Sequence, residues 1–291
     1  MSAPVLLGGL ATTALTLVLS YWLSARHGFN AMGLYGWYIL PFGALLVGLL
    51  AGSGYGIASW ITGFRIQKQT LWVIVGLQVL AYLAAQYVEY LVIRSTAGAF
   101  PSFLPFFDGA TRAIQFEEDG VVGAPLGALG YGIRLLEVLG FVGGALLIPA
   151  GVRNAAYCDA CGRYMKSRAL GILPASVKAR RTWGKGAEEK SAYEAEQETA
   201  LSQGQAVHDH LFGLAEAGDA AAFAESVRLL KDGTKEAGKL PTRLAVNLAA
   251  CPTCRQGVLS SQVLSGHGRG QSTTALAAMP VAPDIVRALD A

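Results

Sequence analysis

The chain has 291 residues, 53% of them hydrophobic, and its mean hydropathy of +0.40 is too high for an ordinary soluble protein. The net charge of +3 is too small to indicate nucleic-acid binding by itself. Residues 1–152 hold only six of the 23 lysines and arginines and six of the 20 aspartates and glutamates. The first half is therefore almost free of charge, whereas residues 153–291 have the composition of a soluble domain.

Four segments in the first half contain the run of roughly 20 apolar residues that a membrane-spanning helix needs. They are residues 4–24, 37–61, 71–93 and 130–152. The first segment is not typical of a cleaved signal peptide, because no Lys or Arg precedes it and its apolar run is too long. The sequence predicts an α-helical membrane bundle of four transmembrane helices over residues 1–152, with a long external loop at 95–129.

The distribution of Lys and Arg predicts the orientation of this bundle, because cytoplasmic loops carry an excess of both. Arg65 and Lys68 lie between the second and third segments. After the fourth segment, residues 153–185 contain eight Lys and Arg and one acidic residue, Asp159. We therefore expect the second loop and residues 153–291 to be cytoplasmic. With four spans, the N-terminus is then cytoplasmic as well.

Small residues in the second segment predict close packing of two helices. Glycines recur every four residues at Gly48, Gly52 and Gly56, so one face of the helix has no bulky side chains there. Gly140 and Gly144 in the fourth segment could form the matching face. We expect these glycines to pack helices together rather than to bind a cofactor.

Three ionisable residues fall within the predicted spans, where charge is costly. Glu89 is in the third segment, and Arg134 and Glu137 are i,i+3 neighbours in the fourth. At about 1.5 Å per residue, all three lie within roughly 6–11 Å of the outer helix ends. We predict a Glu89–Arg134–Glu137 cluster in the outer leaflet, either a structural ion pair or a proton or ion site. The middle of each segment looks apolar, which weighs against transport.

The four cysteines form two pairs of the same spacing, Cys158-Asp-Ala-Cys161 and Cys251-Pro-Thr-Cys254. Two such pairs can supply four thiolates to one tetrahedral metal ion. A site filled by four cysteines has no position for water, so the metal would be structural. Zinc is the expected cofactor, and iron of the rubredoxin type remains open. A disulfide relay is disfavoured, because cytoplasmic thiols stay reduced.

The second half alternates between strand and helix patterns. Residues 163–173, 242–248, 258–264 and 272–279 predict strands, and residues 283–289 a short helix. This layout resembles a zinc ribbon over about 157–174 and 242–280, which implies a small antiparallel sheet held by the metal. The 89 residues between the cysteine pairs depart from the usual ribbon spacing. The sequence therefore predicts a small α+β domain with a helical insert at 187–240.

No hydrolase, transferase or phosphate-binding motif is evident in the sequence, which favours a non-enzymatic role. Our leading hypothesis is a membrane-anchored zinc-binding adaptor or scaffold that presents a cytoplasmic surface to another protein. The alternatives are a transporter or ion-linked protein that uses Glu89, Arg134 and Glu137, and a cytoplasmic thiol redox or metal sensor.

The basic stretch 178–185 is better explained by anionic lipid than by nucleic acid. The layout is similar to uncharacterised bacterial multi-pass proteins with a cytoplasmic domain of two CxxC pairs. That similarity implies the bacterial inner membrane, and it leaves the partner and the oligomeric state open.

Overall fold

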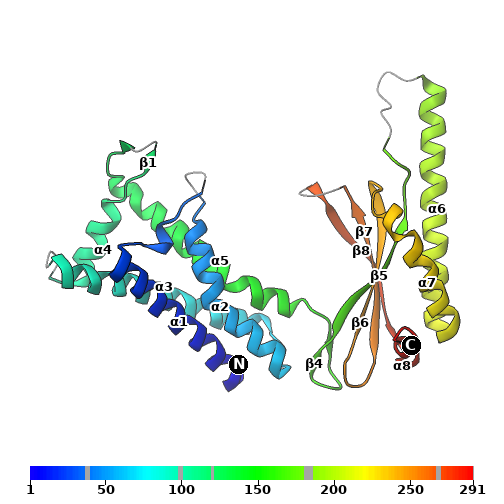
Figure 1. The fold of residues 1–291 in the computed structure, drawn as a ribbon, viewed down its shortest axis with the longest axis horizontal. Coiled ribbons are helices and arrows are strands. Elements are labelled where there is room, and N and C mark those ends of the chain that lie inside the picture. Colours follow the sequence, from blue (N-terminus) through cyan, green and yellow to red (C-terminus); the bar gives the residue numbers. More distant parts are fainter. Residues whose placement is uncertain (37–39, 98–100, 119–120, 180–185, 267–269, 291) are drawn as a thin grey trace. The chain divides into compact units, whose positions relative to one another are not determined.

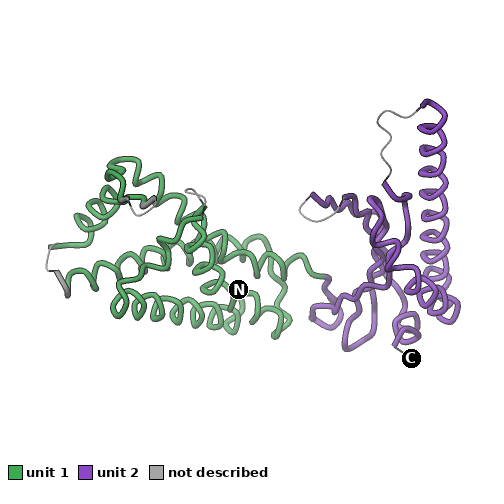
Figure 2. The backbone as a smooth tube through the Cα atoms, turned by 45° about the horizontal axis from the view of Figure 1, so that its top comes forward, with its two compact units in different colours: residues 1–155 green, residues 156–291 purple. Residues whose placement is uncertain are grey.

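The computed structural model describes the chain except for residues 37–39, 98–100, 119–120, 180–185, 267–269 and 291. It forms two compact units, Met1–Ala155 and Ala156–Ala291 (Figure 2). The first contains four helices long and apolar enough to cross a membrane, and the second contains a small sheet, as the sequence predicts. The four helices are α1 (Ala3–His27), α2 (Phe42–Thr62), α3 (Lys68–Ala97) and α5 (Gly130–Arg153).

The observed helix bounds differ most from the prediction at α2. The sequence places its start at residue 37, but residues 37–39 lie outside the described part of the chain, and α2 begins at Phe42. Leu40 forms a β-bridge with Gly36, and Pro41 occupies the N-cap of the helix. The bridge and the proline therefore set the start of the helix, and hydropathy alone registers neither.

The predicted external loop contains another helix, α4 (Phe103–Arg112). Phe106 is buried, and its ring lies 5.5 Å from that of Tyr90 on α3. The ring of Phe103 lies edge-on against that of Tyr87, also on α3, at 5.5 Å. The aromatic side chains of α4 thus pack on the end of α3. A two-stranded ladder, β1 (Glu117–Glu118) with β2 (Val121–Val122), follows.

The contact between α2 and α5 depends on the predicted glycines. A Cβ at Gly48 would overlap the carbonyl group of Phe141, and one at Gly52 would overlap that of Ala145. From α5, a Cβ at Gly144 would overlap the carbonyl of Leu45. The two backbones therefore touch, which confirms the prediction that small residues allow these helices to approach closely.

The neighbouring glycines Gly143 and Gly144 offer a matched test of this contact. We expect Gly144→Ala to lower the stability of the unit by about 1–3 kcal/mol, because the added methyl group would force the helices apart. Gly143 has open space around its Cα, so Gly143→Ala should be neutral or stabilise α5 by up to about 1 kcal/mol. Denaturant unfolding of the full-length protein in detergent measures both, and equal effects would contradict the close packing.

The second unit is built on a four-stranded antiparallel sheet of order β5-β6-β7-β8. Its strands are β5 (Lys166–Pro174), β6 (Thr242–Ala250), β7 (Gly257–Ser265) and β8 (Ser272–Val281). A separate short hairpin, β3 (Tyr157–Cys158) with β4 (Arg163–Tyr164), precedes β5. The ends of the four sheet strands lie within three residues of the predicted ones. The long β5–β6 connection holds the insert, so two strands that pair directly are far apart in the chain.

Helices α6 (Ala187–Ala217) and α7 (Ala220–Ala237) form the insert and cover one face of the sheet (Figure 1). Leu211 of α6 and Phe223 of α7 are buried in the core of this unit. They share that core with Leu244 and Leu248 of strand β6. Asp219 caps the N-terminus of α7, since its Oδ1 accepts a hydrogen bond from the backbone N–H of Ala222 at 3.0 Å.

Only the second part of α6 contributes to the core. Its buried residues begin at Gly204, where a Cβ would overlap the carbonyl of Pro174, and continue through His208 to Ala215. Residues 187–203 have no fully buried side chain. A short final helix, α8 (Pro283–Ala288), contributes Ile285 and Val286 to the same core.

A candidate metal centre and a buried polar cluster

The two cysteine pairs occupy two loops of the same local geometry. In the first, Gly162 follows Cys161 with φ of 62°, and its N–H bonds to the carbonyl of Cys158 at 2.9 Å. In the second, Arg255 follows Cys254 with the same φ of 62°, and its N–H bonds to the carbonyl of Cys251 at 3.1 Å. Glycine adopts this conformation without strain, but arginine rarely does. Each loop therefore folds as a knuckle that aims two sulfur atoms at one point.

The four sulfur atoms lie within 4.8 Å of one another. Sγ of Cys158 and Sγ of Cys254, one from each knuckle, are 3.6 Å apart, and all four cysteines are free rather than in disulfides. Tetrahedral zinc with Zn–S bonds of about 2.3 Å requires sulfur atoms about 3.8 Å apart. The donor set and its spacing therefore fit one tetrahedral metal ion.

The knuckles also influence the ionisation of the thiols. Burial opposes ionisation of Cys251, but the backbone N–H groups of Cys254 and Thr253 more than offset it and lower the pKa of Cys251 to about 7. Hydrogen bonding with Cys254 is the main cause that raises the pKa of Cys161 to about 12. Cys251 therefore ionises more readily than Cys161 in this cluster of close thiols. A metal cation would displace the remaining protons.

The surroundings of the cysteines are apolar. Met165 and Ala249 are buried beside Cys158 and Cys251, and this small cluster is distinct from the main core of the unit. Cys161 and Cys254 are half-buried. With all four positions filled by sulfur, the site can hold a metal and fasten two loops together, but it leaves no open position for a substrate.

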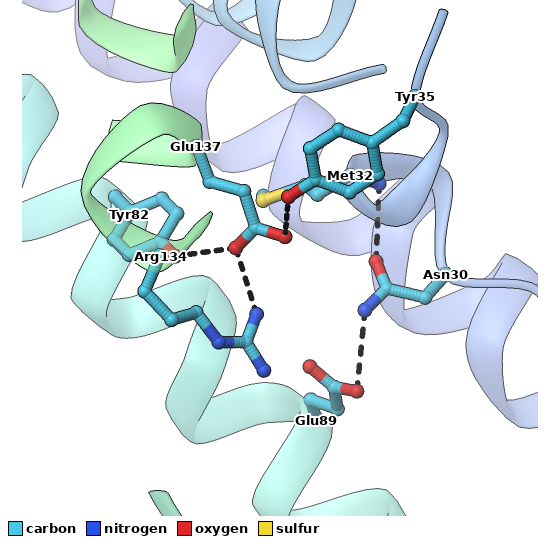
Figure 3. A network of polar contacts seen from close by, with 7 residues as sticks. All are labelled: Asn30, Met32, Tyr35, Tyr82, Glu89, Arg134 and Glu137. Atoms are coloured by element: carbon cyan, nitrogen blue, oxygen red, sulfur yellow. Dashed lines mark hydrogen bonds and ion pairs between the residues drawn. The ribbon is translucent and has the colours of Figure 1, made fainter. Parts of the chain in front are cut away.

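Arg134 and Glu137 lie in a hydrogen-bonded cluster of the first unit (Figure 3). Glu137 is 2% exposed and accepts three bonds, from the hydroxyls of Tyr35 (2.7 Å) and Tyr82 (2.8 Å) and from Nη1 of Arg134 (2.8 Å). The guanidinium of Arg134 also lies 6.0 Å from the ring centre of Phe107 on α4. The carboxylate of Glu137 is therefore fully engaged by donors from three parts of the unit.

The third predicted member, Glu89, has a different partner. Its Oε1 accepts a hydrogen bond from Nδ2 of Asn30 at 3.2 Å, and Oδ1 of Asn30 accepts from the backbone N–H of Met32 at 3.0 Å. Figure 3 shows Glu89 on the side of the cluster where the guanidinium of Arg134 lies. The structure thus joins Arg134 and Glu137 directly and places Glu89 beside them.

Sequence reasoning overlooked a polar stripe on α3 that leads to this cluster. Gln78, Tyr82 and Gln86 recur every four residues and are all buried. Nε2 of Gln78 donates to Oγ1 of Thr13 on α1 at 3.1 Å. The four-residue spacing was visible in the sequence, and it shows that the interior of α3 is not uniformly apolar.

One further arrangement in the second unit has the composition of a catalytic triad. Nε2 of His208 lies 2.9 Å from Oγ of Ser261, and Nδ1 lies 2.8 Å from Oδ1 of Asp209. Ser261 is only 1% exposed, and His208 stacks on Phe212 at 4.3 Å. A substrate could not reach this hydroxyl, so the three residues join α6 to β7 as a structural contact.

A groove of about 370 Å³ lies beside the second knuckle, lined in part by Lys166, Arg168, Arg255 and Asp290. Asp290 bridges both arginines, with Oδ1 2.7 Å from Nη1 of Arg168 and Oδ2 2.8 Å from Nη1 of Arg255. Nε and Nη2 of Arg168 are shielded from solvent and have no hydrogen-bond partner among the described residues. The charged residues that line the groove therefore give it a net positive charge.

Comparison of the chain with protein-family models, with curated proteins and with solved structures found no match. The architecture therefore defines the class of the protein: four long apolar helices followed by a small sheet-containing unit with a four-cysteine cluster.

Proposed function

We propose that this protein is a membrane-anchored adaptor whose zinc-stabilised cytoplasmic domain binds an acidic segment of a partner protein. The four apolar helices would span the bacterial inner membrane, with the N-terminus and the second unit in the cytoplasm. The surplus of Lys and Arg after α5 supports this orientation. Residues 180–185 of the basic stretch lie outside the described residues, so this part of the argument rests on sequence.

Zinc is the metal that best suits the four cysteines in this setting. A closed tetrathiolate site holds zinc as a structural ion, and a small sheet gains folding free energy from it. The cluster would fasten the first knuckle, which follows α5, to the second knuckle between β6 and β7. In this way the metal would hold the groove-lining residue Arg255 in place. Elemental analysis of the purified protein distinguishes zinc from iron.

The groove beside the second knuckle is the observation that carries the adaptor role. Asp290 bridges Arg168 and Arg255, so the two guanidinium groups are spaced to hold a carboxylate, and an acidic partner would displace Asp290 or bind beside it at Lys166. Arg255 adopts a left-handed backbone conformation that glycine would adopt without strain. The side chain placed there lines the groove, where it contributes directly to the positive surface.

The experiment is purification of partners from native membranes after cross-linking, with the full-length protein and with Arg168→Glu/Arg255→Glu. We expect at least a tenfold loss of the recovered partner, because each lost charge-assisted hydrogen bond is worth about 1.5–3 kcal/mol. The matched control reverses Arg228 and Arg287, which are exposed and paired locally with Glu225 and Asp284.

Metal content is measured on the same samples. One zinc per chain in both double variants shows that the domain is folded. Recovery of the same partner by the groove variant, with its zinc intact, would rule out this surface as the binding site.

A further inference from the structure

A small cavity lies at the end of the first unit where α1 and α3 finish. Its volume is about 30 Å³, and its polar lining consists of Ser20, Ser24, Asn30, Gln86 and Glu89. Apolar side chains, among them Ala85 and Val88, form the rest of the wall. That volume exceeds the ~10–15 Å³ that a cavity needs to hold one water molecule, so the cavity admits a small occupant.

The side chains that line the cavity supply oxygen atoms with free lone pairs. Gln86 is 1% exposed, and its Oε1 has no hydrogen-bond partner among the described residues. A buried amide oxygen without a partner costs about 1–3 kcal/mol. The hydroxyl of Ser20 donates to the carbonyl of Thr16 at 2.9 Å, which leaves its lone pairs to accept. Asn30 bonds to Oε1 of Glu89 and thereby fixes the carboxylate at the cavity.

The charges around the cavity do not balance. Within the described part of this cluster there are two carboxylates, Glu89 and Glu137, and one guanidinium, Arg134, so the formal charge is −1. Arg134 is bonded to Glu137 at 2.8 Å. Glu89 is half-buried and has no bonded counter-ion among the described residues, so one added positive charge there would neutralise the cluster.

We propose that this cavity binds one Na⁺ ion, coordinated by the Glu89 carboxylate, Oε1 of Gln86 and the hydroxyls of Ser20 and Ser24. The single charge that is required matches a monovalent cation. A divalent cation would leave the cluster with an excess charge of +1, and Ca²⁺ takes six to eight oxygen ligands, more than the side chains of this lining supply. The site is independent of the adaptor role and lies in the other unit of the protein.

The test uses the full-length protein in detergent and measures its unfolding temperature in NaCl, KCl and choline chloride at constant ionic strength. A ligand that binds only the folded state raises stability with the logarithm of its concentration above the dissociation constant. We expect a saturable increase with Na⁺ and a smaller one with K⁺, relative to choline. Binding of radioactive Na⁺ by the same samples gives the stoichiometry, which should be one ion per chain.

Glu89→Gln should weaken Na⁺ binding at least tenfold. Gln86→Leu removes the unused amide oxygen and adds no charge, so it should weaken Na⁺ binding as well. This variant provides the test if Glu89→Gln folds poorly. The control is Asp108→Asn, because Asp108 is an exposed carboxylate on α4 paired with Arg112. Equal stability in NaCl and choline chloride, or undiminished Na⁺ binding by Glu89→Gln, would overturn the proposal.

Discussion

Replacing Cys251 with serine is expected to abolish metal binding and to unfold the end of the second unit that carries the two knuckles. Cys251 is fully buried and lies in a small apolar cluster separate from the main core. Structural zinc contributes about 10–16 kcal/mol of apparent binding free energy at neutral pH, which is folding free energy for the loops it joins. Elemental analysis should show less than about a tenth of the wild-type metal, and unfolding should begin well below the wild-type temperature.

A second substitution separates the effect of losing the metal from the effect of losing buried packing. Cys161 is half-buried, so Cys161→Ser removes a ligand with little loss of buried apolar surface. We expect it to lose the metal as completely as Cys251→Ser does. Ser260→Ala, on the neighbouring strand β7, should keep both metal and stability. Full metal occupancy in either cysteine variant would mean that the four sulfur atoms do not act as one site.

Glu137→Gln is expected to be the most damaging single substitution of the first unit. Three donors converge on the two oxygen atoms of Glu137, and an amide would replace one oxygen with a group that cannot accept. It would also leave Arg134, which is 8% exposed, without its bonded counter-ion. Breaking a buried ion pair in this way costs about 3–5 kcal/mol. Denaturant unfolding in detergent measures the loss.

Removing both charges should recover part of this loss. In Arg134→Leu/Glu137→Gln no unpaired guanidinium remains, and buried ion pairs can often be replaced by apolar groups at little cost. Asp108→Asn breaks the exposed pair with Arg112 and should change stability little, since that pair is in contact with solvent. If the double variant were no more stable than Glu137→Gln, the unpaired charge of Arg134 would not be the cause of the lost stability.

The elements that the sequence predicts well are those that depend on local pattern. Hydropathy predicted four helices, which the structure contains. The CxxC spacing predicted the two knuckles, because each knuckle needs only a few consecutive residues, and the four sulfur atoms do lie close together. The glycines of α2 were identifiable for the same reason, since their spacing of four residues places them on one helix face.

The contacts that escaped prediction join residues far apart in the chain. Tyr35 and Glu137 are 102 residues apart, and Arg168 and Asp290 are 122 residues apart. No periodicity relates such pairs, because tertiary packing alone decides which tyrosine or aspartate reaches a given charge. The start of α2 was missed because a bridge between Gly36 and Leu40 interrupts an apolar run that hydropathy treats as continuous.

The glycine contacts also suggest which helices of the first unit can move relative to one another. Backbone touches backbone between α2 and α5, and again where Gly54 of α2 meets Gly8 of α1, so these three helices cannot slide without a clash. Helix α3 is held instead by side chains such as Gln78 and Tyr82, whose hydrogen bonds can be exchanged one at a time. We therefore expect α3 to shift more easily than the other three helices, and any such shift would change the distance between Glu89, which it carries, and Arg134.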